Sequence, residues 1–219
     1  MGNIFACGKS SLVWRHQHYD DESSSIENID NVRVYNNNLT VEKIKGIVAT
    51  AIGNQTTDRY TVRIDSKSGN KEILGEVVVG FYTSYYDEKY KATIKYYIYY
   101  NGKSNYNGKS TLSVTGETSS HSDTRFYELC NCGLCVDKEG EELKNGDYIT
   151  LIREGNIMRV EKNKVNIKLV HLNRDHKPIF PFDPKEFFTM PNTPLFPAVE
   201  FKYSNHTTCD ATVTLVQYY

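Results

Sequence analysis

Short runs of β-branched and aromatic residues, separated by turn residues, dominate this chain from residue 31 onward. Examples are IVATAI (47–52), YTVRI (60–64) and EVVVGFYTSY (76–85). Branched and aromatic side chains suit the pleated surface of a sheet, and strand signals about every 8–12 residues are typical of sandwiches and barrels. The sequence therefore predicts one all-β domain, an antiparallel β-sandwich or barrel, over residues 31–219.

Two segments do not follow this pattern. Residues 1–30 become polar and acidic after Trp14, which is typical of a flexible tail or linker. The alternative is that Leu12–Trp14 forms a short strand at the edge of the domain. Leu39–Ile47 is the best helical segment, although Gly46 would end it early. We expect a tail over residues 1–30 and little helix elsewhere.

Charge and hydropathy argue against several classes of protein. The formal net charge is −1 at pH 7, so no overall field attracts nucleic acid. No apolar run approaches the roughly 20 residues that span a bilayer. The first residues lack the apolar core of about 7–15 residues that a secretory signal needs. We expect a protein that is not secreted and has no nucleic-acid partner.

The N-terminal GKSS resembles the end of a phosphate-binding loop. That loop has the form Gly-x4-Gly-Lys-Ser/Thr, in which backbone amides and the lysine hold the phosphates. Here Gly8-Lys9-Ser10 would need a glycine at position 3, which is Asn3, while Gly2 is one residue out of place. The sequence therefore predicts no nucleotide site.

Three of the five cysteines lie in the segment CNCGLC, as Cys130, Cys132 and Cys135. Cys132 and Cys135 have the Cys-x-x-Cys spacing of zinc knuckles and redox pairs. Zinc normally takes four ligands, and no second pair at this spacing occurs in the sequence. We interpret these cysteines as structural and predict no metal, with a metal or redox role as the alternative.

No catalytic motif emerges from the sequence. There is no His-Glu-x-x-His helix and no Gly-x-Ser-x-Gly elbow. The paired carboxylates Asp20-Asp21-Glu22 and Glu141-Glu142 are typical of solvated turns rather than of a glycosidase pair. A Ser-His-Asp arrangement is spatial and is not decided by sequence. We expect no catalytic residues, no cofactor and no enzyme.

Tyrosines cluster in pairs within the predicted strands. Tyr97 and Tyr99 share one face of the strand expected over residues 92–100. Exposed tyrosines offer apolar area and a polar tip at low entropic cost, which suits the binding of peptides. The alternative is a strand buried on both faces, and the sequence does not choose between the two.

Five blocks, in order, resemble the SPRY (B30.2-like) domain. The blocks are Tyr60–Asp65, Val77–Phe81, Gly146–Ile149, Met158–Lys164 and Leu195–Val199. In the same order, they are similar to the W-E-V-x-V, V-x-V-G, G-D-V-I, I-x-F-x-x-N-G and L-Y-P-A-V segments of that family. The resemblance spans about residues 40–219 and implies a concanavalin-like sandwich. Two departures are that the domain lacks tryptophan and that Lys164 replaces the glycine of the hairpin.

The SPRY resemblance also implies a non-catalytic module that binds a protein or peptide through loops at one end of the sandwich. We expect these loops near residues 85–87, 101–107 and 124–126. The candidate binding residues are Tyr85, Tyr86, Asp87, Tyr97, Tyr99, Tyr106, Arg125 and Phe126.

The first residues also resemble a lipid-attachment signal. Removal of Met1 would expose Gly2 for myristoylation, although the usual Ser or Thr at position 6 is Ala6 here. One myristoyl chain binds membranes only marginally, and Cys7 is placed to supply a second anchor by palmitoylation. We therefore predict a membrane partner on the cytosolic side.

The main interpretation is a protein-interaction scaffold tethered to the cytosolic face of a membrane. Abundant Tyr, Asn and Lys have AT-rich codons, which indicates an AT-rich genome such as some protozoan parasites have. In such a cell the scaffold would be cortical. The alternatives are a carbohydrate-binding or carbohydrate-cleaving domain of the same sandwich class, and a cysteine-based metal or redox module.

Overall fold

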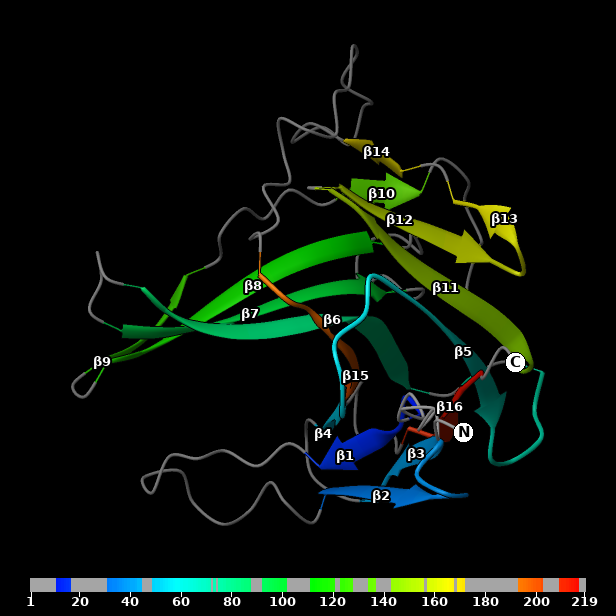
Figure 1. Cartoon of the computed structure of the whole chain (residues 1–219). Coiled ribbons are helices and arrows are strands. Elements are labelled where there is room, and N and C mark those ends of the chain that lie inside the picture. Colours follow the sequence, from blue (N-terminus) through cyan, green and yellow to red (C-terminus); the bar gives the residue numbers. More distant parts are fainter. Residues whose placement is uncertain are drawn as a thin grey trace, which may run out of the picture.

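The structure is a computed structural model in which two antiparallel sheets make up the domain (Figure 1). The backbone is described for all the strands named below. Side chains are described for a smaller set of residues, which leaves out residues 84–136. The described segments are 11–16, 31–44, 49–71, 73, 75–87, 92–101, 111–120, 123–127, 134–136, 143–155, 157–167, 169–171, 193–202 and 209–216. These segments contain strands and no α-helix.

The first sheet, sheet A, has nine strands in the order β1-β4-β15-β6-β7-β8-β10-β14, with β9 added on β8. Its long central strands extend to one side of the molecule, with β9 at their far end (Figure 1). The strands are β1 (Trp14–His16), β4 (Ala49–Gly53), β6 (Glu76–Asp87), β7 (Ala92–Asn101), β8 (Thr111–Ser120), β9 (Asp123–Tyr127), β10 (Leu134–Val136), β14 (Leu169–His171) and β15 (Phe196–Lys202).

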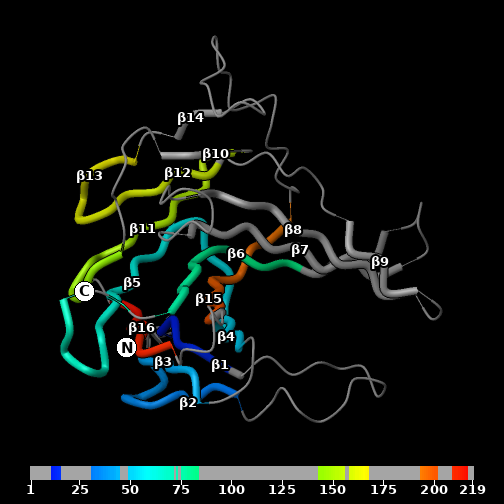
Figure 2. The backbone as a smooth tube through the Cα atoms, turned by 180° about the vertical axis from the view of Figure 1, so that it is seen from behind, coloured from blue at the N-terminus to red at the C-terminus, as the bar shows by residue number. Residues whose placement is uncertain are grey.

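The second sheet, sheet B, has seven strands in the order β13-β12-β11-β5-β16-β3-β2. The C-terminal strand β16 lies in its centre, between β5 and β3, and can be followed in Figure 2. The strands are β2 (Val32–Tyr35), β3 (Thr40–Lys43), β5 (Arg59–Ser66), β11 (Asp147–Glu154), β12 (Ile157–Lys162), β13 (Val165–Asn166) and β16 (Ala211–Leu215).

The two sheets pack face to face over one apolar core. Alternate residues of each strand point inward, so that Val79 and Phe81 of sheet A face the same core as Val62, Ile64 and Ile149 of sheet B. All five side chains are fully buried. Alternation with one face buried is the pattern expected of an antiparallel sandwich. The predicted fold class is therefore confirmed.

The start of the chain differs from the expected tail. Trp14–His16 forms β1, which pairs with Gly53, Ile52 and Ala51 of β4. The Trp14 side chain is only 1% exposed and belongs to the main core. Burial of a large aromatic side chain offsets the entropy lost in ordering a short strand. The alternative of a short edge strand is what the structure shows for these residues.

The segment Leu39–Ile47 is also different from the sequence-based expectation. Residues Thr40–Lys43 form a strand, not a helix, and this strand lies between β2 and β16. Thr40 and Val41 are β-branched, and Val41 is fully buried in the core. Tertiary pairing and β-branched side chains therefore prevail over the weak helical pattern.

Tyr60 links the two sheets through the core. Its hydroxyl, on β5 of sheet B, donates to the backbone carbonyl of Gly80, and the carbonyl of Ala198 lies 3.2 Å away. Its ring makes an edge-on contact with Phe81, with 5.3 Å between ring centroids. Burial raises the pKa of the Tyr60 phenol well above its usual range, so the hydroxyl remains a donor.

We predict that Tyr60→Phe lowers the free energy of unfolding by about 1–2 kcal/mol, because it leaves carbonyls in the core without this donor while keeping the ring. Denaturant unfolding of the purified chain measures the change. Tyr148→Phe is the matched control, since Tyr148 is 40% exposed. Equal stability of Tyr60→Phe and the control would contradict the role assigned to the hydroxyl.

Gly75 lies just before β6. Among the glycines whose surroundings the structure describes, it leaves the least room for a Cβ atom. Its φ is +90°, and a Cβ there would lie 2.8 Å from the Cα of Cys209. Gly69 also has a positive φ, of +73°, but a Cβ there would meet nothing within 4 Å. A side chain at Gly69 would therefore meet only the cost of a left-handed backbone, whereas one at Gly75 would also meet a steric clash.

We predict that Gly75→Ala destabilises the fold by more than 2 kcal/mol, and Gly69→Ala by about 1 kcal/mol. The second substitution adds only the cost of a left-handed backbone, whereas the first adds a clash with backbone atoms of Cys209. Thermal or denaturant unfolding of both variants measures the difference. Similar losses for the two would show that the contact with Cys209 does not constrain the turn.

Candidate functional site

Residues on five neighbouring strands of sheet B form a continuous row on the face away from the core. Tyr35 on β2 lies opposite Thr40 on β3, which lies opposite Thr214 on β16. Thr214 lies opposite Arg63 on β5, and Arg63 lies opposite Tyr148 on β11. With about 4.8 Å between strands, the backbones of the two tyrosines are roughly 19 Å apart. We call these five residues the Tyr–Tyr row.

The two tyrosines at the ends of the Tyr–Tyr row are exposed, and Thr40 between them is buried. Tyr35 is 39% exposed and Tyr148 is 40% exposed, while Thr40 is only 5% exposed. Thr214 is half-buried, and its hydroxyl lies 3.0 Å from the hydroxyl of Thr40. A pair of hydroxyls uses one donor between them, so a further O–H is able to donate. The row thus has an aromatic ring at each end, with two threonines and Arg63 between them.

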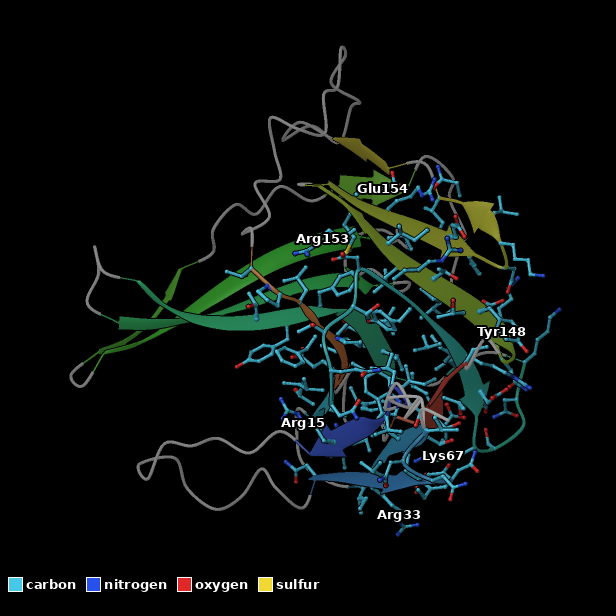
Figure 3. The ribbon with its side chains drawn as sticks, in the orientation of Figure 1. Arg15, Arg33, Lys67, Tyr148, Arg153 and Glu154 are labelled. Carbon is cyan, nitrogen blue, oxygen red and sulfur yellow. The ribbon has the colours of Figure 1, made fainter. Side chains whose placement is uncertain are left out.

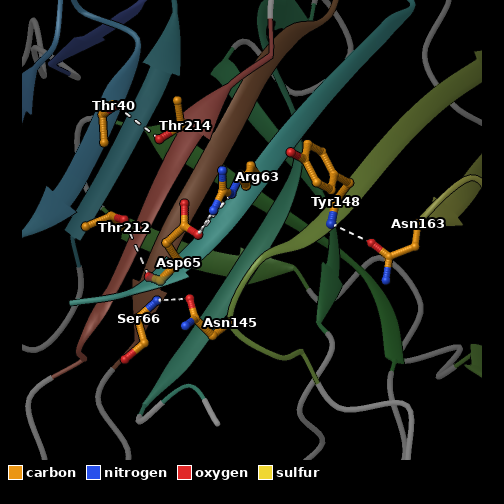
Figure 4. Close-up of polar contacts among 9 residues, drawn as sticks. All are labelled: Thr40, Arg63, Asp65, Ser66, Asn145, Tyr148, Asn163, Thr212 and Thr214. Carbon is orange, nitrogen blue, oxygen red and sulfur yellow. Dashed lines mark hydrogen bonds and ion pairs between the residues drawn. The ribbon is translucent and has the colours of Figure 1, made fainter. Parts of the chain in front are cut away.

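Arg63 brings a guanidinium into the row beside Tyr148. Its carbon Cζ lies 6.0 Å from the centroid of the Tyr148 ring, within the range of a cation–π contact. Its Nε donates to Oδ1 of Asp65 at 3.0 Å, and Nη2 lies 2.8 Å from the same oxygen (Figure 4). Asp65 therefore holds the guanidinium along β5, with Arg63 half-exposed.

A polar turn fixes the position of Tyr148 at the start of β11. The Tyr148 amide donates to Oδ1 of Asn163 at 2.9 Å, and Nδ2 of Asn163 donates to Oδ1 of Asp147 at 2.9 Å. Asn163 and Lys164 have φ values of 51° and 68°, the left-handed pair that a two-residue hairpin turn needs. The Tyr148 backbone is therefore held by the β12–β13 hairpin.

The other end of the row lies next to a second left-handed turn. Asn36, Asn37 and Asn38 have φ values of 54°, 55° and 61°, which asparagine tolerates better than most residues. Burial and the neighbouring carboxylate of Glu42 raise the pKa of the Tyr35 phenol. Tyr35 is therefore an uncharged phenol at neutral pH.

The rest of this face is also polar. Thr61 and Thr150 are buried and their hydroxyls lie 2.9 Å apart. Figure 3 shows Arg33 on β2 and Tyr148 on β11, two strands of sheet B. A face built of threonine, tyrosine and paired charges can stack on a ring and hydrogen-bond to hydroxyl groups.

The binding residues predicted from sequence lie elsewhere, in strands of sheet A. Residues 85–87 end β6 and residues 124–126 lie in β9, so both are strands rather than the expected loops. Cross-strand register carries Tyr85 through Ile94 and Thr118 to Arg125, which brings the two segments to one end of sheet A. A protein site at this end stays a prediction, because these side chains are not described.

The other predicted binding residues also lie in strands of sheet A, except Tyr106. Tyr97 and Tyr99 lie in β7, opposite Tyr82 and Gly80. Asp87, Tyr86 and Phe126 lie in the strands just described, whereas Tyr106 is outside the described residues.

Sheet A buries side chains on both faces along β6 and β15. Val79 and Val199 belong to the main core, whereas Val78 and Ala198 form a second cluster on the other face with Tyr82 packed against it. Val78 and Ala198 are at most 1% exposed. These two strands are therefore buried on both faces, whereas the question for the tyrosine-rich strand over residues 92–100 stays open, because its side chains are not described.

The lipid and cysteine predictions are not decided by the structure. Gly2, Cys7, Cys130 and Cys132 lie outside the described residues, so lipid attachment stays a prediction. Within the described segments, no group of three or more His, Cys, Asp or Glu side chains is placed to hold a metal. The same segments contain no helix that is long and apolar enough to span a membrane.

Cys209 is the cysteine whose surroundings the structure describes. It is 1% exposed and its Sγ lies 4.0 Å from the carbonyl oxygen of Glu76. Burial raises the pKa of this thiol, which keeps it protonated. Cys209 therefore acts as a small core residue, while the structural interpretation of Cys130, Cys132 and Cys135 stays a prediction.

No protein-family model matches the sequence, and a search of curated proteins found no match. The five blocks that resemble SPRY lie in β5, β6, β11, the β12–β13 hairpin and β15. Membership of the SPRY family stays a prediction.

Solved structures do resemble this chain in fold. An endo-acting O-glycanase, described as expressed by human gut microbiota to initiate mucin breakdown, has a TM-score of 0.50 at 10% identity and covers 95% of this chain and 93% of its own. The β-porphyranase of the gut bacterium Bacteroides plebeius has 0.41 at 7%, covering 76% and 65%. The kappa-carrageenase of Pseudoalteromonas carrageenovora has 0.41 at 9%, covering 99% of both chains. The likeness to the O-glycanase shows the fold alone.

This finding overturns the prediction that the chain is not an enzyme. That prediction depended on identifying the sandwich as a recognition module, but the O-glycanase is an enzyme of the same fold. A fold hosts many functions, and function resides in the site. The sandwich therefore gives no ground for excluding catalysis.

The Tyr–Tyr row was missed because its members are far apart in sequence. Sequence reasoning selected tyrosine doublets, whereas Tyr35 and Tyr148 are single tyrosines beside turns. One available signal was the alternation in RYTVRID (59–65) and ATVTL (211–215), whose polar members all point away from the core. Strand order, which the sequence does not show, is what aligns them.

Proposed function

We propose that the Tyr–Tyr row of sheet B binds carbohydrate. The observation that carries the proposal is the pair of half-exposed tyrosines at the two ends of a polar cross-strand row. Sugar rings have apolar C–H faces that pack on aromatic rings, and hydroxyl rims that match threonine hydroxyls and a guanidinium. This supports the carbohydrate alternative over the scaffold interpretation.

Preorganisation of the row also supports binding. Arg63 is held by Asp65 at 2.8 Å, and the Tyr148 amide is held by Asn163. Groups that are already ordered lose less conformational entropy when a ligand arrives. A polar ligand would therefore meet a surface whose donors and acceptors are in place.

The likeness to the O-glycanase agrees with this proposal at the level of fold alone. That protein is an endo-acting O-glycanase built on a similar sandwich, at 10% identity to this chain. It supports the choice of glycans as the first ligands to screen. Whether bound glycan is also cleaved is a separate readout of the same experiment.

We predict that Tyr148→Ala and Tyr35→Ala each weaken binding of a soluble polysaccharide at least tenfold, or about 1.4 kcal/mol. Loss of the ring removes the stacking surface at one end of the row. Isothermal titration calorimetry of the full chain against a panel of glucans, mannans and xylans measures it, and chromatography of each mixture detects cleavage.

Val165→Ala is the matched control for these variants. Val165 is 68% exposed but lies on β13, at the edge of sheet B and outside the row. Binding by this variant should equal that of the unmodified chain. If the tyrosine variants bind as tightly as the control, or if no member of the panel binds at all, the row is not a carbohydrate site.

A further inference from the structure

The arginines on the outer face of sheet B are paired with carboxylates. Each described arginine of this face has a carboxylate partner within 4 Å. The pairs are Arg33–Glu42 at 3.2 Å, Arg59–Glu161 at 3.8 Å, Arg63–Asp65 at 2.8 Å and Arg159–Glu154 at 3.1 Å. Lys67 also lies 3.8 Å from Glu42, so these ion pairs join four arginines and one lysine to four carboxylates. The face is therefore rich in charged groups, and each of its described arginines has its charge compensated by a carboxylate.

The pairing matters most at Arg63, which lies in the Tyr–Tyr row itself. Both Nε and Nη2 of Arg63 point to the same oxygen of Asp65, at 3.0 and 2.8 Å. A guanidinium has five N–H donors, so this pair compensates its charge while other N–H groups can still donate. Arg63 can therefore donate hydrogen bonds to a ligand, while Asp65 compensates its positive charge.

An anionic ligand would meet unfavourable neighbours on this face. Asp65 and Glu42 lie on either side of Thr212, in the row next to the Tyr–Tyr row. A ligand carboxylate or sulfate would have to displace Asp65 from Arg63 or tolerate both carboxylates, and like charges at close range oppose binding. An uncharged ligand meets neither cost.

The row is also long. Its tyrosine backbones are roughly 19 Å apart across the strands. A single sugar ring covers one tyrosine but not the other, so both rings are used only by an extended ligand.

We propose, on the basis of the proposed carbohydrate function, that the ligand is an uncharged, extended saccharide chain that lies across the five strands between Tyr35 and Tyr148. Neutral charge follows from the paired arginines, and chain length follows from the separation of the two tyrosines.

The first experiment compares each neutral polysaccharide of the panel with its carboxymethylated or sulfated derivative, using the full chain at 50 and 500 mM NaCl. We expect the neutral form to bind at least tenfold more tightly than the anionic form. Binding of the neutral form should change less than twofold with salt, because no net ion pairing forms.

Asp65→Asn tests most directly whether the paired charge of Arg63 sets the preference for a neutral ligand. It removes the charge that compensates Arg63 and keeps a side chain of the same shape. We expect this variant to gain binding of the anionic derivatives, with a salt dependence that the unmodified chain lacks. Lys164→Gln, in the exposed hairpin turn beside Tyr148, is the control and should leave the preference for the neutral form unchanged.

A series of neutral oligosaccharides, from disaccharide to octasaccharide, tests chain length. Affinity should rise with length until the chain reaches both tyrosines and then level off. In Tyr35→Ala the rise should stop earlier, while binding of the shortest oligosaccharides at Tyr148 stays the same. Affinity independent of length would overturn the extended mode of binding.

The outcomes separate this inference from the proposed function. Binding only of anionic derivatives, lost at 500 mM NaCl, would overturn the neutral ligand and leave a carbohydrate function in place. Loss of that anionic binding in Lys164→Gln would assign it to the turn. No binding to any member of the panel would overturn both the function and this inference.

Discussion

Burial of apolar side chains between two sheets is the constraint on which the other features of this molecule depend. Each fully buried valine, isoleucine or phenylalanine contributes about 1.5–3 kcal/mol, and these residues alternate along the core strands. Because side chains alternate with a period of two, a slip of one residue would put Tyr148 in the core and Ile149 in solvent. The core thus fixes which polar residues share the outer face, and the Tyr60 hydroxyl ties the sheets at the centre.

Strand content was readable from sequence because it depends on local pattern. The alternation in YTVRI is a local signal, and the strand occurs where expected, whereas the hairpin at Asn163–Lys164 was expected only from the SPRY resemblance. A strand near Trp14 was only the alternative to the expected tail, because three residues form a strand only when Trp14 has a core to enter. Thr40–Lys43 was misread for a similar reason, since pairing with β2 and β16 is invisible in its own sequence.

The candidate site was beyond sequence reasoning for a different reason. Its five residues come from positions 35, 40, 63, 148 and 214, and only the order of strands in sheet B makes them neighbours. Tyrosine doublets drew attention to sheet A, where Val78 and Ala198 show that β6 and β15 are buried on both faces. Sheet B has the opposite character, with a buried inner face and an outer face of threonines, tyrosines and paired charges.

The most direct measurement is an NMR titration of the isotopically labelled chain with a neutral oligosaccharide long enough to reach both tyrosines. Our account predicts that amide shifts concentrate on β2, β3, β16, β5 and β11, around the Tyr–Tyr row. It also predicts that Tyr35→Ala removes the shifts at the β2 end first. Shifts confined to β6–β9 of sheet A would contradict a binding face on sheet B.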